Sequence, residues 1–212
     1  MANGGGNVRG IDVAHYQGTV DWKQVCQSGI VFAFAKATDG ITYTDPEFAT
    51  NWAGIKAAGL VRGAYHFFEP VDDATSQAQH FLSTVQLAPG DLPPVLDVEI
   101  LPSGVSTSQL WSGVATWLQV VEQHTGRTPM IYTAPGFWDS NAPDLALTKY
   151  PLWLADYASQ PKLPNGWTTW QIWQFSQSGS VSGVTGAVDL DEFNGSMEQF
   201  LAFVGGQAPD VA

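Results

Sequence analysis

The sequence predicts an α/β fold of one domain, an irregular TIM-like (β/α) barrel with about eight strands and fewer than eight helices. A chain of 212 residues is long enough for one barrel. Short apolar runs alternate with segments of helical periodicity, which is the pattern of a parallel sheet. Between residues 135 and 190 the helical signal is weak, and Pro, Gly, Ser and Trp are frequent. We therefore expect loops or antiparallel strands to replace some helices there.

The predicted strands are short runs of apolar and β-branched residues that end at turn-forming residues. We expect the last run to lie beside the first, because the first and last strands of a closed barrel are neighbours. In chain order, the runs cover residues 9–16, 30–38, 61–68, 93–100, 129–134, 151–157, 168–175 and 188–195.

Four helices are predicted between the strands, because apolar residues recur there at helical spacing. The third ends at Gly126, and the last begins after Ser196, a good capping residue. A cap at Asp72 or Asp73 precedes the second. The four helices span residues 45–59, 75–85, 107–124 and 196–204.

The remaining segments are short. Residues 1–8 form a Gly-rich stretch that we expect to be a flexible lead, and residues 206–212 are expected to be a tail. The lead contains no apolar core of a signal peptide. No apolar run is long enough to cross a membrane. The folded domain is therefore predicted to span residues 9–205.

Composition excludes several classes of partner. The chain has 20 acidic and 8 basic residues and a net charge of −12, so it has no basic surface for phosphates. Nucleic acids and anionic membranes are not expected as partners. The one cysteine, Cys26, excludes an internal disulfide and a cysteine-based zinc cluster. The sequence contains no GxSxG, HExxH or P-loop motif.

Two acids stand out inside the apolar run PVLDVEI at residues 94–100. Residues two apart in a strand face the same side, about 6.6 Å from each other, so Asp97 and Glu99 point together. The carboxyl ends of barrel strands carry the chemistry of such folds, and both acids lie near that end. Asp12 and Asp189 lie in the first and last strands and are expected to converge on the same place.

Glycoside hydrolases use a pair of carboxyl groups with different pKa values as their catalytic residues. Two other interpretations of the acids remain open. A buried aspartate can be structural, through a turn cap or an ion pair with Lys36 or Arg62. Alternatively, the four acids could bind Mg²⁺ or Mn²⁺ through oxygen ligands in a metal-dependent hydrolase. The aromatic residues near the strand ends, Tyr65, Phe67, Tyr132, Trp153 and Tyr157, favour a carbohydrate groove as a set.

Together these segments resemble the family 25 glycoside hydrolases, the N,O-diacetylmuramidase lysozymes. The resemblance extends from Gly10 to Gly195, with Ala14 and Asp39 where the family often has serine and glutamate. The matching segments are GIDVAHYQG (10–18), FAFAKATDG (32–40), GAYHFF (63–68), LDVE (96–99), IYT (131–133), PLWLADY (151–157), WQF (173–175) and VDLDEFNG (188–195).

The resemblance implies a muramidase catalytic domain at residues 9–205. Such an enzyme cleaves β-1,4 bonds between N-acetylmuramic acid and N-acetylglucosamine in peptidoglycan, with retention of configuration. By motif, Glu99 is the general acid/base and Asp97 its partner, and Asp12 and Asp189 match the other two acids. The expected sugar-contacting residues are Tyr65, Phe67, Tyr132, Trp153 and Gln174.

The expected partner is therefore the glycan strand of the bacterial cell wall, with no cofactor and no metal. The expected protein is a monomer that acts outside the cell or on the wall, either as a secreted enzyme or as a phage endolysin. An inactive peptidoglycan-binding module is the remaining alternative, although acids are present at all four matching positions.

Overall fold

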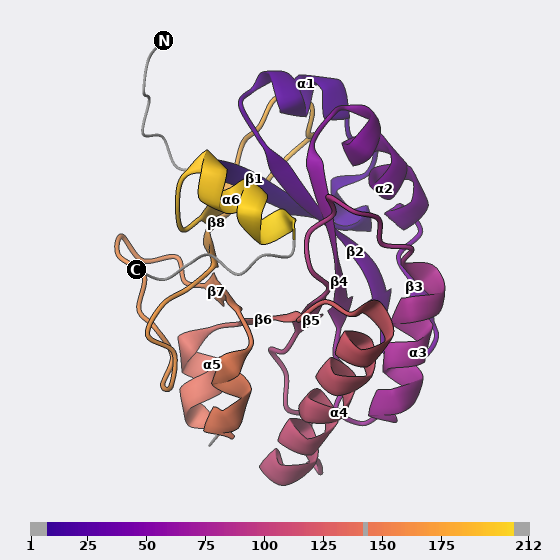
Figure 1. Cartoon of the computed structure of the whole chain (residues 1–212), viewed down its shortest axis with the longest axis vertical. Coiled ribbons are helices and arrows are strands. Elements are labelled where there is room, and N and C mark those ends of the chain that lie inside the picture. Colours follow the sequence, from indigo (N-terminus) through magenta and orange to yellow (C-terminus); the bar gives the residue numbers. More distant parts are fainter. Residues whose placement is uncertain (1–7, 142–143, 206–212) are drawn as a thin grey trace.

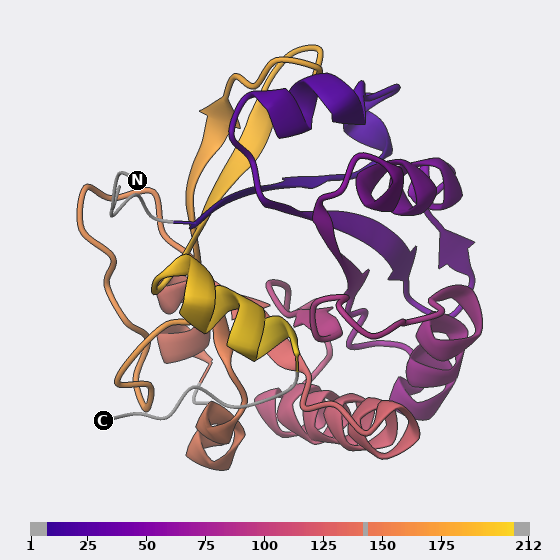
Figure 2. The same cartoon turned by 45° about the horizontal axis from the view of Figure 1, so that its top comes forward.

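The computed structural model describes residues 8–141 and 144–205 and shows one closed barrel (Figures 1 and 2). The barrel closes because β1 pairs with both β2 and β9. All eight predicted strands are present, which confirms the predicted fold. They are β1 (Val8–Val13), β2 (Phe32–Asp39), β4 (Val61–Phe67), β5 (Val95–Asp97), β6 (Met130–Thr133), β7 (Leu152–Ala155), β8 (Ile172–Gly179) and β9 (Val188–Phe193).

Two strands depart from the parallel arrangement. β9 runs antiparallel to both β8 and β1, as expected for the region with weak helical signal. β3 (Tyr43–Thr44) is not predicted, and it pairs antiparallel with the end of β2 only. The segment 180–187 between β8 and β9 is too short for a crossover helix, so the chain returns as a hairpin.

Residues 8–141 and 144–205 contain the four predicted helices and two further short ones. α5 is not predicted, because six residues are too few to show a helical period. Within the described residues, no helix is long and apolar enough to cross a membrane. The helices are α1 (Trp22–Gln27), α2 (Phe48–Ala57), α3 (Ala74–Thr84), α4 (Thr107–Thr125), α5 (Pro135–Ser140) and α6 (Met197–Val204), with 3₁₀ turns η1 (His15–Gln17) and η2 (Leu145–Lys149).

The predicted helix ends agree with the capping geometry. The Asp73 side chain accepts a hydrogen bond from the Ser76 backbone N–H, so Asp73 rather than Asp72 caps α3. Ser196 caps α6. Gly126 ends α4 with φ 67°, a left-handed conformation that favours glycine.

Val8 does not belong to a flexible lead, in contrast to the expected bounds of residues 1–8. It is a buried strand residue that pairs with Phe193 of β9. Its apolar side chain belongs to the barrel interior, which is why the strand begins one residue before the predicted one. Residues 1–7 of the expected lead and the expected tail, 206–212, lie outside the described residues.

Strand alternation separates two apolar cores. Inward positions such as Phe32, Phe34 and Trp153 fill the barrel, and α6 covers one end of it with Phe200 and Phe203 (Figure 2). Outward positions pack against the surrounding helices in a second, larger core. The filled interior leaves the other end of the barrel, at the carboxyl ends of the parallel strands, for polar residues.

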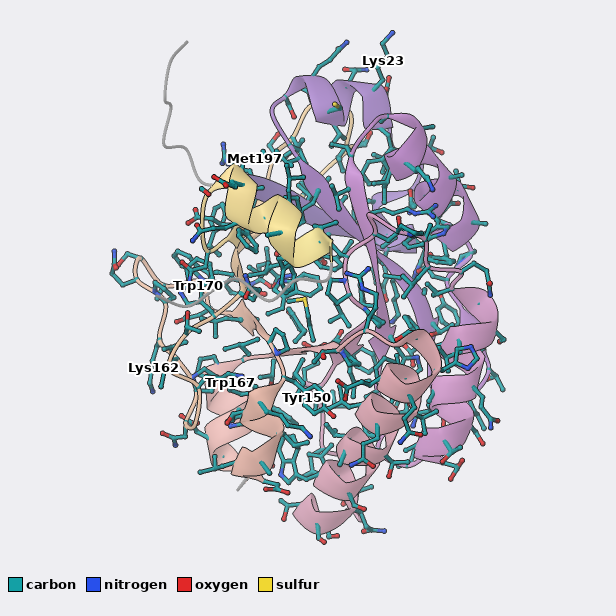
Figure 3. All side chains as sticks on the ribbon, viewed as in Figure 1. Lys23, Tyr150, Lys162, Trp167, Trp170 and Met197 are labelled. Atoms are coloured by element: carbon teal, nitrogen blue, oxygen red, sulfur yellow. The ribbon has the colours of Figure 1, made fainter. Side chains whose placement is uncertain are left out.

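The long segment between β7 and β8 has no helix but is anchored by tryptophans. Trp167 Nε1 donates to the Tyr150 carbonyl oxygen at 2.9 Å, and both residues are buried (Figure 3). Trp138 Nε1 donates to the Asn165 carbonyl oxygen at 3.0 Å. These contacts explain how a Trp-rich segment with weak helical signal still covers the barrel wall.

Gly63→Ala is expected to lower the free energy of unfolding by about 1–3 kcal/mol through overpacking. An added Cβ at Gly63 would lie 2.2 Å from the Phe34 ring, which is stacked on Trp153 and cannot withdraw. Gly136→Ala is the control, because Gly136 has open space around it in α5. Urea unfolding measures both variants, and a Gly63→Ala midpoint equal to wild type would contradict this packing.

Candidate active site

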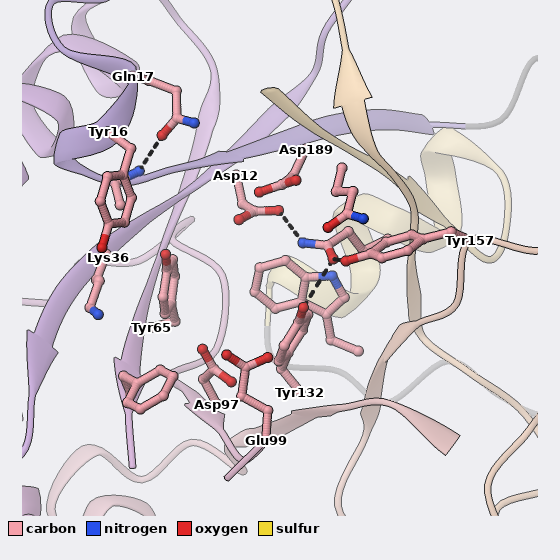
Figure 4. A pocket seen from close by; sticks show the side chains of 15 residues that line it. Asp12, Tyr16, Gln17, Lys36, Tyr65, Asp97, Glu99, Tyr132, Tyr157 and Asp189 are labelled. Carbon is pink, nitrogen blue, oxygen red and sulfur yellow. Dashed lines mark hydrogen bonds between the residues drawn. The ribbon is translucent and has the colours of Figure 1, made fainter. Parts of the chain in front are cut away.

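The barrel mouth brings together the four acids predicted from the sequence. Asp12, Asp97, Glu99 and Asp189 all line one cavity of about 300 Å³ (Figure 4). They come from β1, from β5 and the residues after it, and from β9. The predicted convergence of acids from three strands is therefore observed.

Asp12 and Asp189 are direct partners in the β1–β9 pairing. Asp12 lies near the carboxyl end of β1, whereas Asp189 is the second residue of β9. Because β9 runs antiparallel to β1, the start of β9 lies at the same end of the barrel as the end of β1. The antiparallel last strand thus explains why Asp189 faces the cavity.

Asp97 and Glu99 reach the cavity from one side, as their spacing predicts, while Val98 is buried in the outer core. β5 ends at Asp97, but backbone hydrogen bonds hold the next residues extended. The Val98 N–H donates to the Tyr132 carbonyl oxygen at 2.9 Å, and Thr133 Oγ1 donates to the Val98 carbonyl oxygen at 2.8 Å. Glu99 therefore lies past the end of β5, and the extended backbone before it directs its side chain toward the cavity.

All five expected sugar-contacting residues line the same cavity, namely Tyr65, Phe67, Tyr132, Trp153 and Gln174. They differ in how much of each side chain is available. Trp153 is 2% exposed, and its Nε1 donates to Asp191. Tyr65, Phe67 and Tyr132 are half-buried. The tyrosines and Phe67 can offer surface to a ligand, whereas Trp153 belongs mainly to the floor.

Gln174 connects the acids to the aromatic side of the cavity. Its Nε2 donates to Asp12 Oδ2 at 2.7 Å. Its Oε1 accepts hydrogen bonds from the hydroxyls of Tyr132 at 2.9 Å and Tyr157 at 2.8 Å. With both ends of the amide engaged, Gln174 orients Asp12 and two tyrosines in this structure.

Several lining residues are absent from the predicted set, including Tyr16, Gln17, Lys36 and Gln177. The position of Lys36 in the cavity could have been predicted from the sequence. Lys36 is the one cation in the apolar run FAFAKAT, and it lies at the same strand spacing as Phe32 and Phe34. Its Nζ contacts Asp39 Oδ2 at 2.7 Å and lies 4.8 Å from the centre of the Phe67 ring. Tyr16 is 81% exposed at the rim, and its loop gives no pattern from which its position could be predicted.

Burial dominates the electrostatics of the acid pair. It raises the pKa of Asp97 well above its usual value, and the charge of Glu99 raises it further. Burial also raises the pKa of Glu99, although Lys36 opposes the shift. Asp97 Oδ1 is buried and has no hydrogen-bond partner among the described residues. The pair therefore keeps a proton at a pH where an isolated carboxyl group would have lost it.

The free energy of unfolding is expected to fall as the pH rises from about 5 to about 8. Burial raises the folded-state pKa of five carboxyl groups in and beneath the barrel mouth, so the folded protein binds protons that the unfolded chain releases. Their stabilisation is complete below the unfolded pKa near 4 and is lost as the pH rises through the folded values. Urea midpoints across this range measure it, and a rising midpoint would contradict it. The groups are Asp12, Asp97, Glu99, Asp189 and Asp191.

A metal-dependent hydrolase, one of the alternatives, would require acids grouped around a metal ion. Across residues 8–141 and 144–205, no group of three or more His, Cys, Asp or Glu side chains is arranged to hold a metal ion. Of the four acids, Asp12 accepts a hydrogen bond from the Gln174 amide and is the strand partner of Asp189.

A barrel with paired carboxyl groups at the carboxyl ends of its strands fits the class of the glycoside hydrolases. The chain belongs to the glycosyl hydrolases family 25, whose sequence model matches residues 11–184. The resemblance seen in the sequence is thereby confirmed.

Known proteins similar to the chain cover nearly all of it. YegX of Escherichia coli strain K12 is 42% identical over 94% of this chain and 74% of its own length. Lysozyme M1 of Streptomyces globisporus is 38% identical over 95% of this chain and 72% of its own. The solved bacterial lysozyme from Streptomyces coelicolor is 37% identical, with a TM-score of 0.90, covering 96% of this chain and all of that one (100%).

Proposed function

We propose that this family 25 hydrolase is a muramidase, which hydrolyses β-1,4 bonds between N-acetylmuramic acid and N-acetylglucosamine in peptidoglycan and so lyses bacterial cell walls. The observation that carries the proposal is the Asp97–Glu99 pair, whose carboxyl groups line one cavity and whose pKa values are both raised by burial. The similarity to Lysozyme M1 and to the Streptomyces coelicolor lysozyme supports the choice of substrate.

In this proposal Glu99 is the general acid. Glu99 is the more exposed member of the pair and lies past the strand end, so it can reach the glycosidic oxygen. It donates its proton to the leaving oxygen and then accepts a proton from the incoming water. When the single proton of the pair resides on Glu99, Asp97 carries the negative charge. Donation of that proton leaves Glu99 ionised as well, and Glu99 can then accept the proton of the incoming water.

Asp97 then stabilises the positive charge that develops at the sugar, and the reaction proceeds with retention. Two routes are compatible with retention. In one, Asp97 bonds covalently to the sugar. In the other, the acetamide of the substrate attacks and Asp97 orients it and balances its charge. We favour the acetamide route, with Asp12 and Asp189 as hydrogen-bonding partners of the acetamide and of the acid.

The substrate is a glycan strand, and the cavity offers Tyr65, Phe67 and Tyr132 as surfaces for sugar rings. No metal or cofactor takes part in the proposed reaction. The enzyme acts on the bacterial cell wall as a monomer.

Release of reducing ends from purified peptidoglycan tests the proposal against its alternatives. We expect release at the same rate with and without a chelator such as EDTA. Loss of activity with EDTA, restored by Mg²⁺ or Mn²⁺, would favour the metal-dependent hydrolase. Binding to peptidoglycan with no release of reducing ends would favour the inactive binding module.

A further inference from the structure

A fifth acid, Asp191, lies below the site and has no role in the reaction as proposed. It is fully buried at 0% exposure and does not line the cavity. One carboxyl oxygen, Oδ1, accepts a hydrogen bond from Trp153 Nε1 at 2.9 Å. The other, Oδ2, is buried, and no N–H or hydroxyl group of the described residues donates to it. A buried carboxyl group with an unused oxygen requires an explanation.

Strand register places Asp191 on the strand next to Asp12, diagonally below it and one inward position deeper in the barrel. On β9, Asp189 and Asp191 are two apart and face inward together. Asp189 pairs with Asp12 on β1, and Asp191 pairs with Gly10. An added Cβ at Gly10 would lie 2.2 Å from the Phe32 ring, so no side chain fits opposite Asp191. The nearest ionisable groups are therefore Asp12 above it and Asp189 along its own strand.

Within the part of the chain that the structure describes, no cation acts on Asp12, Asp189 or Asp191. The groups that act on Asp191 are the Asp12 carboxyl group from β1, the Asp189 carboxyl group from β9 and the Trp153 indole from β7. Burial raises the pKa of both Asp191 and Asp12, and the charge of Asp191 raises that of Asp12 further. The two carboxyl groups are near enough for a hydrogen bond if one of them carries a proton. Two adjacent buried carboxyl groups with neutral donors cannot both ionise at neutral pH without a large cost.

We propose that Asp191 and Asp12 share one proton in a hydrogen bond, so that the pair carries a single negative charge at neutral pH. One arrangement satisfies every donor and acceptor. Trp153 Nε1–H binds one oxygen of Asp191, Gln174 Nε2–H binds one oxygen of Asp12, and the shared proton bridges the two residues. The pair titrates as a unit, so the proton belongs to both residues.

Asp191 is then a positioning residue for the reaction. It fixes the Asp12 carboxyl group from below, while Gln174 fixes it from the side facing Tyr132 and Tyr157. The shared proton also reduces the negative charge beside Asp189 and the Asp97–Glu99 pair. The functional part of this inference depends on the proposed role of Asp12 in the muramidase reaction, whereas the shared proton does not.

Proton release on unfolding tests the shared proton without a substrate, so its result is independent of the proposed function. In Asp191→Asn, the amide can donate to Asp12 in place of the shared proton. Between about pH 6 and pH 8, wild type is expected to release about one more proton on unfolding than Asp191→Asn does. The pH dependence of urea unfolding measures this number. The control Asp73→Asn changes an exposed helix cap and should match wild type.

Activity gives the second readout. Asp191→Asn should keep kcat/KM within about threefold of wild type, whereas Asp191→Ala, which removes the donor, should lower kcat by about tenfold with little change in KM. Equal proton release from wild type and Asp191→Asn would overturn the proposal. A kcat/KM of Asp191→Asn reduced by about a hundredfold would overturn it as well, because a charged Asp191 would then be required. If Asp191→Ala does not fold, the Asn variant alone decides.

Discussion

Glu99→Gln is expected to lower kcat/KM on bacterial cell walls by about 10²- to 10⁴-fold, the usual contribution of general acid–base catalysis. The amide has the shape of the carboxyl group but cannot give a proton to the glycosidic oxygen. Clearing of a cell-wall suspension, together with release of reducing ends, measures the loss. The fold should be retained, because the Glu99 side chain reaches the cavity from beyond the end of β5.

The matched control is Glu198→Gln on α6, at the opposite end of the barrel from the acids. Glu198 is exposed in the first turn of that helix and does not line the cavity. The Glu198→Gln variant should therefore clear cell walls at the wild-type rate. Near-wild-type clearing by Glu99→Gln would remove Glu99 from the mechanism.

Asp97→Asn is expected to lower kcat by about 10²- to 10³-fold, because the charge that stabilises the transition state is lost. Steady-state kinetics on soluble glycan fragments measure kcat and KM separately. Asp144→Asn is the control, since Asp144 caps η2 at the surface and asparagine caps equally well. An Asp97→Asn enzyme with wild-type kcat would exclude a catalytic charge at this position.

The same residue distinguishes the two routes to retention. With a 2-fluoro sugar as a trap, the acetamide route predicts an enzyme of unchanged mass. A stable adduct on Asp97 would contradict that route and establish the covalent one.

Much of the fold could be predicted from the sequence because local pattern and global architecture agree. The alternation of Phe32, Phe34 and Lys36 with small alanines identifies a strand with one side in the barrel and one against helices. α5 was missed because it is only six residues long. The loop after β7 depends on distant contacts, such as that of Trp167 with the Tyr150 carbonyl oxygen, which no local pattern reveals.

In the candidate site, too, some residues could be predicted from local spacing and others depend on contacts between distant segments. Asp97 and Glu99 could be found because a spacing of two within an apolar run fixes their common direction. Asp189 and Asp191 have that same spacing, yet one faces the cavity and the other is enclosed beneath it. That difference depends on the register of β9 against β1 and on the depth of each residue in the barrel. Likewise, the three hydrogen bonds of Gln174 connect residues from four strands or their adjoining loops. They could not be predicted from the sequence, because they form only in the folded chain.

Mass analysis of the fragments released from a defined peptidoglycan tests the central claim most directly. After borohydride reduction of the products, we expect reduced N-acetylmuramic acid at the new chain ends, as cleavage of the muramic acid bond requires. Reduced N-acetylglucosamine at those ends would show that the other glycosidic bond is cut. Intact glycan strands with cleaved peptides would contradict glycoside hydrolysis of this substrate altogether.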